Sequence, residues 1–353
     1  SDQDIYIEDS KAWVSGYGGT VVLDISDPAL ISELGSIDLH DGGAWDIKIS
    51  DSNHLYALDA FHSSIRVFDL NNFTSFQEIS SISLDGNSNE TWGAYEYNDI
   101  MEINGDYLYY SHSDNNDSGS VNIYDISNPN NPTFHSTYRT AISEIHDVIF
   151  YQNNLILYGK IWGDDGWQVS YSSGFEIVDF SNINNPSQQS LTQYAHDNSP
   201  YSSSMNMTID SDTIITLFND TVDSTMILNF YSLVDLENPL LVQNVELANY
   251  NTYQNDIALF ENKLYISSHD YGIGVIDISD IENCFLDTIY NEEYTTSLHI
   301  DTVGSNFLYH INYSLNASLL DLELLTIKES DNFNNSGYSG ADIESNGEYI
   351  VVS

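Results

Sequence analysis

The chain has almost no cysteine and very few basic residues. Cys284 is the single cysteine in 353 residues, so no disulfide can form within the chain. It lies in the apolar stretch ENCFLDTIY, which predicts a buried, unreactive thiol rather than a nucleophile. Lysine and arginine number 7 against 54 acidic residues, giving a formal net charge of −47. Such a chain repels phosphate groups, which argues against nucleic acid and anionic membranes as partners.

Long hydrophobic runs and a secretory signal are also missing. No stretch approaches the roughly 18 consecutive apolar residues that a membrane-spanning helix needs, so we expect no membrane insertion. The first residues, SDQDIYIED, lack the basic and apolar segments of a signal peptide, so such a signal is expected to have been removed or never to have existed.

Two further features of the composition are compatible with an extracellular or cell-surface protein. The strong acidity suits salty surroundings, which screen the repulsion between carboxylates. Eight Asn-x-Ser/Thr sequons permit a secreted glycoprotein, although a chain rich in these residues acquires sequons by chance. The sequons begin at Asn72, Asn89, Asn116, Asn206, Asn219, Asn312, Asn316 and Asn334.

Catalytic signatures are absent from the sequence. There is no G-x-S-x-G nucleophile elbow, no phosphate-binding G-x-x-x-x-G-K loop, no H-E-x-x-H zinc motif and no cysteine-based metal motif. A chain with 54 acidic residues always permits some carboxylate pair, so a polysaccharide hydrolase or lyase remains an alternative. The favoured prediction is a protein without enzymatic activity.

What the sequence does contain is a repeated phrase. It reads VVLDISDP up to Pro28, VNIYDISNP up to Pro129 and IGVIDISD up to Asp280, with weaker copies IRVFDLNN, FEIVDFSN, LVDLENP and SLLDLEL. The aspartates of the phrase recur every 42 to 56 residues, a period typical of one four-stranded β-propeller blade. They are Asp24, Asp69, Asp125, Asp179, Asp235, Asp277 and Asp321.

Each period predicts four strands: an innermost strand with an Asp-apolar pair, a strand with an aromatic residue, a strand ending in the phrase, and a polar strand. Residues 1–353 are therefore predicted to form one all-β domain, a β-propeller. Seven full units are followed by SGADIESNGEYIVVS, which repeats only the first two strands. We favour eight blades with a two-stranded last blade, and seven blades with a displaced half-blade is the alternative.

Two units depart from the regular pattern. The fourth has an insertion, GDDGWQVSYSS, between its second and third strands. In the fifth, two registers fit, because either YSL or VDL can end the third strand.

The phrases GTVVLDISDP, VNIYDISNPNNP and GIGVIDISD, each followed by a polar strand and a new Asp-Ile start, resemble the LVIVD repeat family. The resemblance covers nearly the whole chain and implies a β-propeller of a bacterial or archaeal cell-surface or secreted protein. It implies no catalytic residues, because the family has no shared catalytic motif. The seventh unit departs from the pattern, since it lacks the Ser and Pro of the phrase.

Two groups of residues are candidates for a cation site. Aspartates recur in the innermost strands, which line the channel of a propeller, and this ring would either cap backbone amides or recruit a cation such as Ca²⁺. The second group lies in DNNDSGSVNIYD, which partly matches the spacing of a calcium loop, although a simple hairpin turn is the favoured interpretation. The ring comprises Asp4, Asp46, Asp99, Asp147, Asp256 and Asp342, and the segment offers Asp114, Asn116, Ser118 and Asp125.

The aspartate of the phrase has a structural explanation. Its carboxylate is expected to accept hydrogen bonds from the backbone two residues later, in the turn to the fourth strand. Histidines also precede aspartates, but neighbours in a strand point to opposite faces, so no His–Asp dyad is expected within a pair. These pairs are His40–Asp41, His146–Asp147, His196–Asp197 and His269–Asp270.

The sequence as a whole favours a structural or adhesive building block. Its 26 tyrosines supply side chains of the kind enriched at interfaces. The surplus half unit leaves a strand edge open for pairing with another chain, so we expect head-to-tail self-association. The alternative is a glycan- or cation-binding module at the acidic mouth of the channel.

Overall fold

The structure is a computed structural model, and it describes the chain as a series of strands with their turns. The described residues are 5–8, 11–16, 19–24, 32–39, 46–59, 64–71, 76–84, 100–114, 118–164, 169–194, 205–220, 225–248, 257–268, 272–290, 295–301, 307–312, 316–321, 326–332, 343–345 and 350–352. They contain no helix of the length and hydrophobicity needed to cross a membrane.

The strands form seven four-stranded antiparallel sheets and one two-stranded sheet, numbered here in chain order. Sheets 1 and 2 comprise β1 (Ile5–Glu8), β2 (Lys11–Gly16), β3 (Gly19–Asp24), β4 (Ser32–Asp38), β5 (Ile47–Ser50), β6 (His54–Asp59), β7 (Ser64–Asp69) and β8 (Gln77–Ser83). Sheets 3 and 4 comprise β9 (Ile100–Asn104), β10 (Tyr107–Asp114), β11 (Ser118–Asp125), β12 (Thr133–Arg139), β13 (Glu144–Tyr151), β14 (Asn154–Asp164), β15 (Val169–Asp179) and β16 (Ser187–Tyr194).

The second half of the chain continues the pattern. Sheets 5 and 6 comprise β17 (Met205–Asp210), β18 (Thr213–Asp220), β19 (Thr225–Ser232), β20 (Leu240–Ala248), β21 (Ile257–Phe260), β22 (Lys263–Ser268), β23 (Gly272–Asp277) and β24 (Phe285–Tyr290). Sheets 7 and 8 comprise β25 (Thr295–Asp301), β26 (Phe307–Asn312), β27 (Asn316–Asp321), β28 (Thr326–Asn332), β29 (Ile343–Ser345) and β30 (Ile350–Val352).

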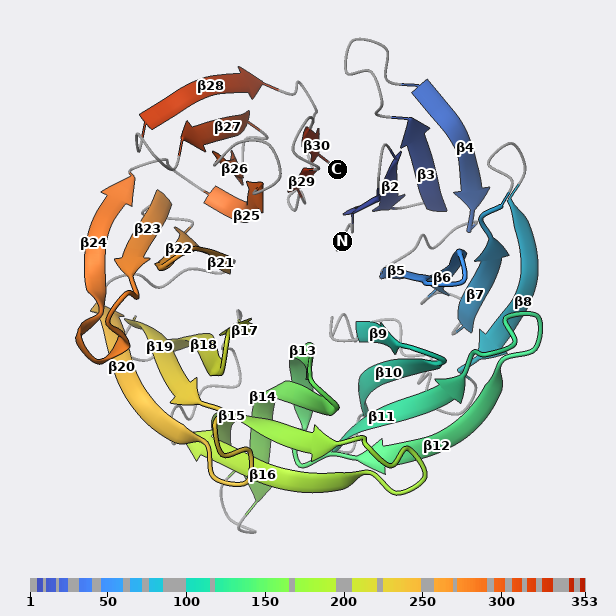
Figure 1. Ribbon diagram of the computed structural model, residues 1–353, viewed down its shortest axis with the longest axis horizontal. Coiled ribbons are helices and arrows are strands. Elements are labelled where there is room, and N and C mark those ends of the chain that lie inside the picture. The colour runs from blue at the N-terminus through green and yellow to red at the C-terminus, as the bar shows by residue number, and fades with distance from the viewer. Residues whose placement is uncertain are drawn as a thin grey trace.

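The sheets stand side by side around a central opening, with the first strand of each sheet innermost (Figure 1). Each innermost strand contacts the innermost strand of the next sheet, and β29 contacts both β25 and β1. The two-stranded sheet therefore has a position of its own between sheets 7 and 1. The predicted all-β propeller is confirmed, whereas the assignment of eight blades stays a prediction.

One hydrogen bond is repeated in five sheets and explains the apolar residue of the repeated phrase. The residue that follows the third strand donates its backbone N–H to a carbonyl in the turn between the first and second strands, while its side chain is buried. This bond ties two corners of the sheet together. The donor–acceptor pairs are Leu70–Asn53, Ile126–Asp106, Phe180–Asn153, Leu233–Asp212 and Ile278–Asn262, at 2.7 to 3.2 Å.

The same bond settles the register of sheet 5. Leu233 is the donor there, so β19 ends at Ser232, and the YSL register is the one adopted. The inclusion of Asp235 among the strand-ending aspartates was therefore wrong. Asp235 lies in the following turn, where its carboxylate accepts the backbone N–H of Glu237 at 3.0 Å. A turn aspartate and a strand-ending aspartate make the same local bond, which is why the sequence pattern misassigned it.

The insertion predicted in the fourth unit is built into the sheet. β14 and β15 each have 11 residues and remain paired as far as Asp164 and Val169. The additional residues therefore lengthen a hairpin that projects beyond the neighbouring strands.

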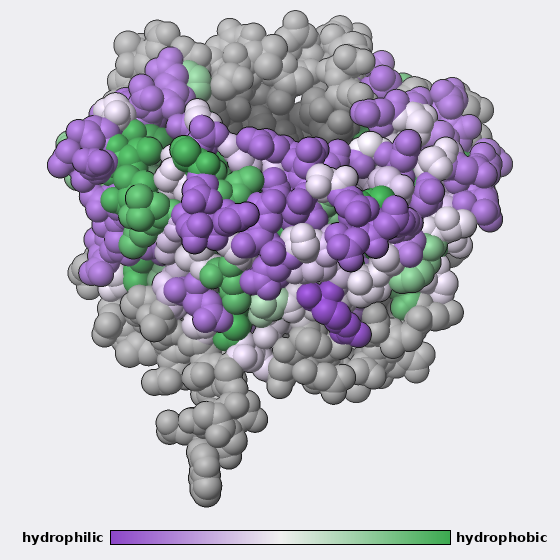
Figure 2. Space-filling model, turned by 60° about the horizontal axis from the view of Figure 1, so that its bottom comes forward, coloured by the Kyte–Doolittle hydropathy of each residue, from purple (hydrophilic) through white to green (hydrophobic). Residues whose placement is uncertain are grey.

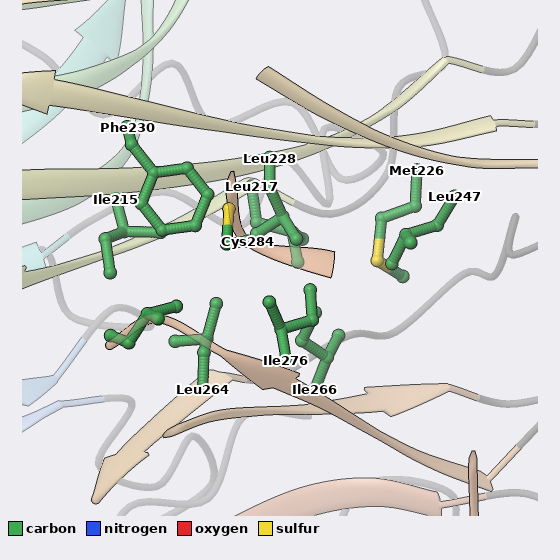
Figure 3. Close-up of a cluster of buried hydrophobic side chains, with 11 residues drawn as sticks. Ile215, Leu217, Met226, Leu228, Phe230, Leu247, Leu264, Ile266, Ile276 and Cys284 are labelled. Carbon is green, nitrogen blue, oxygen red and sulfur yellow. The ribbon is translucent and has the colours of Figure 1, made fainter. Parts of the chain in front are cut away.

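The hydrophobic core is divided into clusters that lie between neighbouring sheets. In the cluster between sheets 5 and 6, side chains from β18 and β19 pack against side chains from β22 and β23. Figure 3 shows Leu217 and Leu228 facing Ile266 and Ile276. Cys284 belongs to this cluster and is buried, as predicted. Similar clusters join sheets 1 and 2, 2 and 3, 3 and 4, 4 and 5, and 6 and 7. Each sheet is thus stabilised by burial against its neighbours.

Truncation of Leu228 tests this arrangement. Leu228 is fully buried between sheets 5 and 6, so Leu228→Ala is expected to lower the free energy of unfolding by about 3 kcal/mol through lost burial and an unfilled cavity. Leu240→Ala, at an exposed leucine of the same sheet, is the matched control and should change it by less than about 0.5 kcal/mol. Urea denaturation of both variants measures the difference, and equal effects would contradict the packing described.

Candidate functional site

Two aspartates at the inner strands accept hydrogen bonds from the backbone of the neighbouring sheet. Asp46, which precedes β5, accepts the backbone N–H of Met101 on β9 at 2.6 Å. Asp147 on β13 accepts the backbone N–H of Met207 on β17 at 2.8 Å and that of Val148 at 2.8 Å. Both carboxylates thus join one sheet to the next, which is the capping role that the sequence left open beside cation binding.

The other members of the predicted ring cannot be compared with these two. Asp4, Asp99, Asp256 and Asp342 lie outside the described residues. Among the residues that the structure does describe, no group of three or more His, Cys, Asp or Glu side chains is arranged to hold a metal ion. Calcium binding by the ring stays a prediction.

The predicted calcium segment is a β-hairpin. Asp114 and Ser118 are register partners where β10 and β11 meet, and Asn116 lies outside the described residues. Asp125 ends β11 and is paired with Tyr107 at the far end of the hairpin. An extended strand separates Ser118 from Asp125 by about 23 Å, so one ion cannot contact both. The spacing of these residues in the sequence matches a calcium loop, but a β-strand keeps them apart, whereas a calcium loop would bring them around one ion.

Asp125 instead has the predicted turn role. Its carboxylate accepts the backbone N–H of Ser127 at 3.0 Å and the hydroxyl of the same residue at 2.6 Å, and these bonds lower the pKa of Asp125. Asp69, Asp179 and Asp277 accept a backbone N–H two residues later in the same way. In sheet 5 the hydroxyl of Ser232 takes this place, 3.5 Å from the backbone nitrogen of Val234.

A second link between sheets is ionic. The Lys48 ammonium on β5 lies 3.6 Å from Asp46 Oδ1 and 3.7 Å from Glu102 Oε1 on β9. Burial raises the pKa of Glu102, and the nearby Lys48 opposes this rise. At the junction of sheets 2 and 3, the positive charge of Lys48 is therefore paired with the negative charges of Asp46 and Glu102.

A partly buried carboxylate with two basic partners lies in sheet 4. Glu144 Oε1 is 3.0 Å from the Lys160 ammonium and 2.9 Å from His146 Nε2, while Glu144 Oε2 is 3.2 Å from Lys160. Burial alone would raise the pKa of Glu144, but His146 and Lys160 outweigh it and lower the pKa to about 2. Glu144 and His146 are two residues apart on β13, and side chains at this spacing in a strand lie on the same face. The other three His–Asp pairs lie outside the described residues.

One further polar position of the repeat was not predicted from the sequence. It lies on the third strand, three residues before the strand's last residue, and its side chain bonds to the outer strand of its own sheet or of the preceding one. Arg66 donates to Glu78 at 2.5 Å, Asn122 accepts from Thr137 at 2.6 Å, and Asn229 accepts from Asn244 at 2.8 Å.

Glu176 holds this position in sheet 4 and is completely buried. It accepts the Tyr138 hydroxyl, the Thr140 hydroxyl and, at 2.7 Å, the backbone N–H of Ala141. Those groups belong to β12 and to the segment that leads into sheet 4, so this carboxylate also fastens two sheets together. The detectable signal was a polar residue that recurs inside otherwise apolar strands such as FEIVDF.

Comparison with known protein families matches the repeated units. The LVIVD repeat is found at residues 3–38, 99–140 and 253–292. The chain contains LVIVD repeats. These three LVIVD segments correspond to sheets 1, 3 and 6, which carry the clearest copies of the phrase, and the predicted resemblance is confirmed there. No curated protein matches the sequence.

Solved propeller structures resemble the whole fold of this LVIVD repeat chain. Sqt1 from Chaetomium thermophilum matches with a TM-score of 0.68 and 13% identity, over 97% of this chain and 90% of that one. The same protein bound to the N-terminus of a ribosomal protein matches with a TM-score of 0.62 and 11% identity, over 99% and 89%. BamB from Moraxella catarrhalis matches with a TM-score of 0.58 and 10% identity, over 88% and 81%. At these identities the likeness concerns the fold alone.

The pKa of Asp147 gives a pH-dependent prediction. Burial raises it to about 7, although the two backbone hydrogen bonds oppose the rise. An unfolded aspartate titrates near about 3.9, so between these values the folded protein holds a proton that the unfolded chain has released. The free energy of unfolding contributed by Asp147 therefore falls as the pH rises through this window.

Asp147→Asn is expected to remove this fall, because the amide does not titrate. Urea denaturation at several pH values between about 4 and 8 measures it as the difference from the wild type. Asp46→Asn is the control, because it replaces a carboxylate that makes the same kind of hydrogen bond to the next sheet. A wild-type slope retained in Asp147→Asn would show that the carboxyl group is not enclosed as described.

Removal of the Lys160 ammonium tests the buried ion pair. Lys160→Met removes the ammonium group beside the partly buried Glu144 carboxylate, so we expect the free energy of unfolding to fall by about 3 kcal/mol at neutral pH. The double variant Glu144→Gln/Lys160→Met removes the carboxylate charge as well and should recover part of that loss. Chemical denaturation measures the free energy of unfolding of both variants. A double variant that is less stable than Lys160→Met would contradict the pairing of Glu144 with Lys160.

Proposed function

We propose that this chain is a non-catalytic, extracellular structural propeller that joins copies of itself by strand addition at sheet 8. The observation that carries the proposal is the number of strands in that sheet. Sheets 1 to 7 have four strands each, whereas sheet 8 has only β29 and β30 among the described residues.

The geometry of sheet 8 supports strand addition. β30 pairs with β29 on one side, through Ile343–Val352, Glu344–Val351 and Ser345–Ile350. In every other sheet the second strand is also paired with a third strand. A strand paired on one side leaves backbone N–H and C=O groups available, and such an edge is a template for a strand from another chain.

The hydrogen bonds of the described carboxylates also support a structural role. The described carboxylates Asp46, Asp147, Glu144 and Glu176 are each bonded to backbone amides, hydroxyls or basic side chains of the same chain. Carboxylates engaged in this way stabilise the junctions between sheets and are not free to act on a substrate. Glycan or cation binding at the channel mouth stays a prediction that these contacts do not favour.

One of the similar propellers offers a precedent for binding the terminus of another chain. The structure of Sqt1 that resembles this fold is bound to the N-terminus of a ribosomal protein. The likeness is one of fold, and it supports only the general idea that a propeller of this shape can receive a chain segment.

A proline in β30 tests the proposal. Val351→Pro removes a backbone N–H and blocks pairing along the edge, whereas Val351→Thr keeps the N–H and is the matched control. In salt high enough to screen the net charge, light scattering after size exclusion and electron microscopy should show multimers for the wild type and the control, and monomers for Val351→Pro. The melting temperature of Val351→Pro should be retained, because the clusters between sheets 1 to 7 are untouched. Multimers of Val351→Pro, or a monomeric wild type, would contradict strand addition.

A further inference from the structure

Large hydrophobic side chains are exposed on the outer ends of sheets 5 and 6. The exposed fractions are 80% for Val234, 68% for Leu240, 47% for Leu241 and 60% for Phe285. They lie in the turn before β20 and at the first residues of β20 and β24. Figure 2 shows hydrophobic surface gathered on the left of the molecule, the side on which Figure 1 places these two strands.

The repeat itself shows that the fold does not require hydrophobic residues at these positions. Leu240 and Phe285 begin the outer strand and pair with the last residue of the third strand. The residues at the same register in the earlier sheets are Ser32, Gln77, Thr133 and Ser187. Val234 occupies the place of Asn71, Ser127, Ser181 and Ser279, two residues after the third strand. Sheets 5 and 6 therefore replace polar surface residues with apolar ones.

The two sheets bring these residues to a common surface. The side chain of Gln243 on β20 donates to the carbonyl of Glu282 at 3.0 Å, and the short 3₁₀ helix Ile281–Asn283 contacts β20. The turn that leads into β24 therefore lies against the outer strand of sheet 5. Isolated exposed side chains need no explanation, but several on adjoining elements indicate an interaction surface.

The charge around this surface indicates the kind of partner. Asp235, Glu237, Asp280 and Glu282 are exposed in the same two turns. Lys263 is the only lysine or arginine in the sequence between positions 161 and 327. A second copy, with its net charge of −47, would bring carboxylates against carboxylates. Anionic lipid is disfavoured for the same reason. An apolar segment flanked by lysine or arginine is complementary in both respects.

We propose that Val234, Leu240, Leu241 and Phe285 form a docking surface for an amphipathic, lysine- or arginine-rich segment of a partner protein. The apolar side chains of the segment cover the four residues, and its basic side chains pair with the carboxylates of the two turns. This surface is separate from the β30 edge, so the two proposals are tested by different variants.

The probe is a synthetic peptide of leucine and lysine with an amphipathic pattern, titrated into the full chain by fluorescence anisotropy. The triple variant Val234→Ser/Leu240→Thr/Phe285→Thr carries residue types that the chain uses at these positions in other sheets, so it should fold normally. We expect it to bind the peptide at least about tenfold more weakly than the wild type. Phe134→Thr, at an exposed aromatic residue of sheet 3, is the matched control and should bind as the wild type does.

Two further peptides separate this surface from general attraction to an acidic protein. A peptide with serine in place of leucine should bind the wild type and the triple variant equally, since only charge attracts it. A peptide with glutamate in place of lysine should not bind. Unchanged affinity of the triple variant for the leucine–lysine peptide would overturn the proposal, as would an equal loss in Phe134→Thr or tight binding of the glutamate peptide.

Discussion

A short carboxylate that accepts a backbone N–H is the interaction on which this propeller most depends. It closes the turn after the third strand at Asp69, Asp125, Asp179 and Asp277, and it crosses from one sheet to the next at Asp46 and Asp147. Each innermost strand is paired on one side only within its sheet, so its outward amides need other acceptors, and a buried amide without an acceptor is costly. Some of the many carboxylates therefore stabilise the fold and do not serve solubility alone.

The scarce basic residues are used in the same way. Lys48 pairs with carboxylates on two adjoining sheets, Arg66 with Glu78, and Lys160 with Glu144. Cations held in such pairs reduce the repulsion at the junctions where carboxylates are concentrated. The two turns beside Val234 and Phe285 carry the exposed carboxylates Asp235, Glu237, Asp280 and Glu282, which is why a basic partner suits this docking surface.

Local patterns in the sequence predicted local structure well. The aspartate of the phrase was correctly predicted to accept a backbone N–H two residues later, because both groups belong to neighbours in the chain. The junctions between sheets were less accessible. Asp46 and Met101 are 55 residues apart and Asp147 and Met207 are 60 apart, so the sequence placed these aspartates near the channel without identifying their partners. Glu176 was overlooked because its bonds also lead to another sheet. Ser118 and Asp125 were grouped by spacing, although strand extension separates them.

The most direct test concerns Asp46, because its carboxylate is either a bond between sheets or a ligand for a cation. Hydrogen exchange at the Met101 amide should quicken in Asp46→Ala, and the free energy of unfolding should fall by about 1 to 3 kcal/mol, by the same amount with and without calcium. A wild type that calcium stabilises in proportion to its concentration, with the effect lost in Asp46→Ala and the Met101 amide unchanged, would contradict the account.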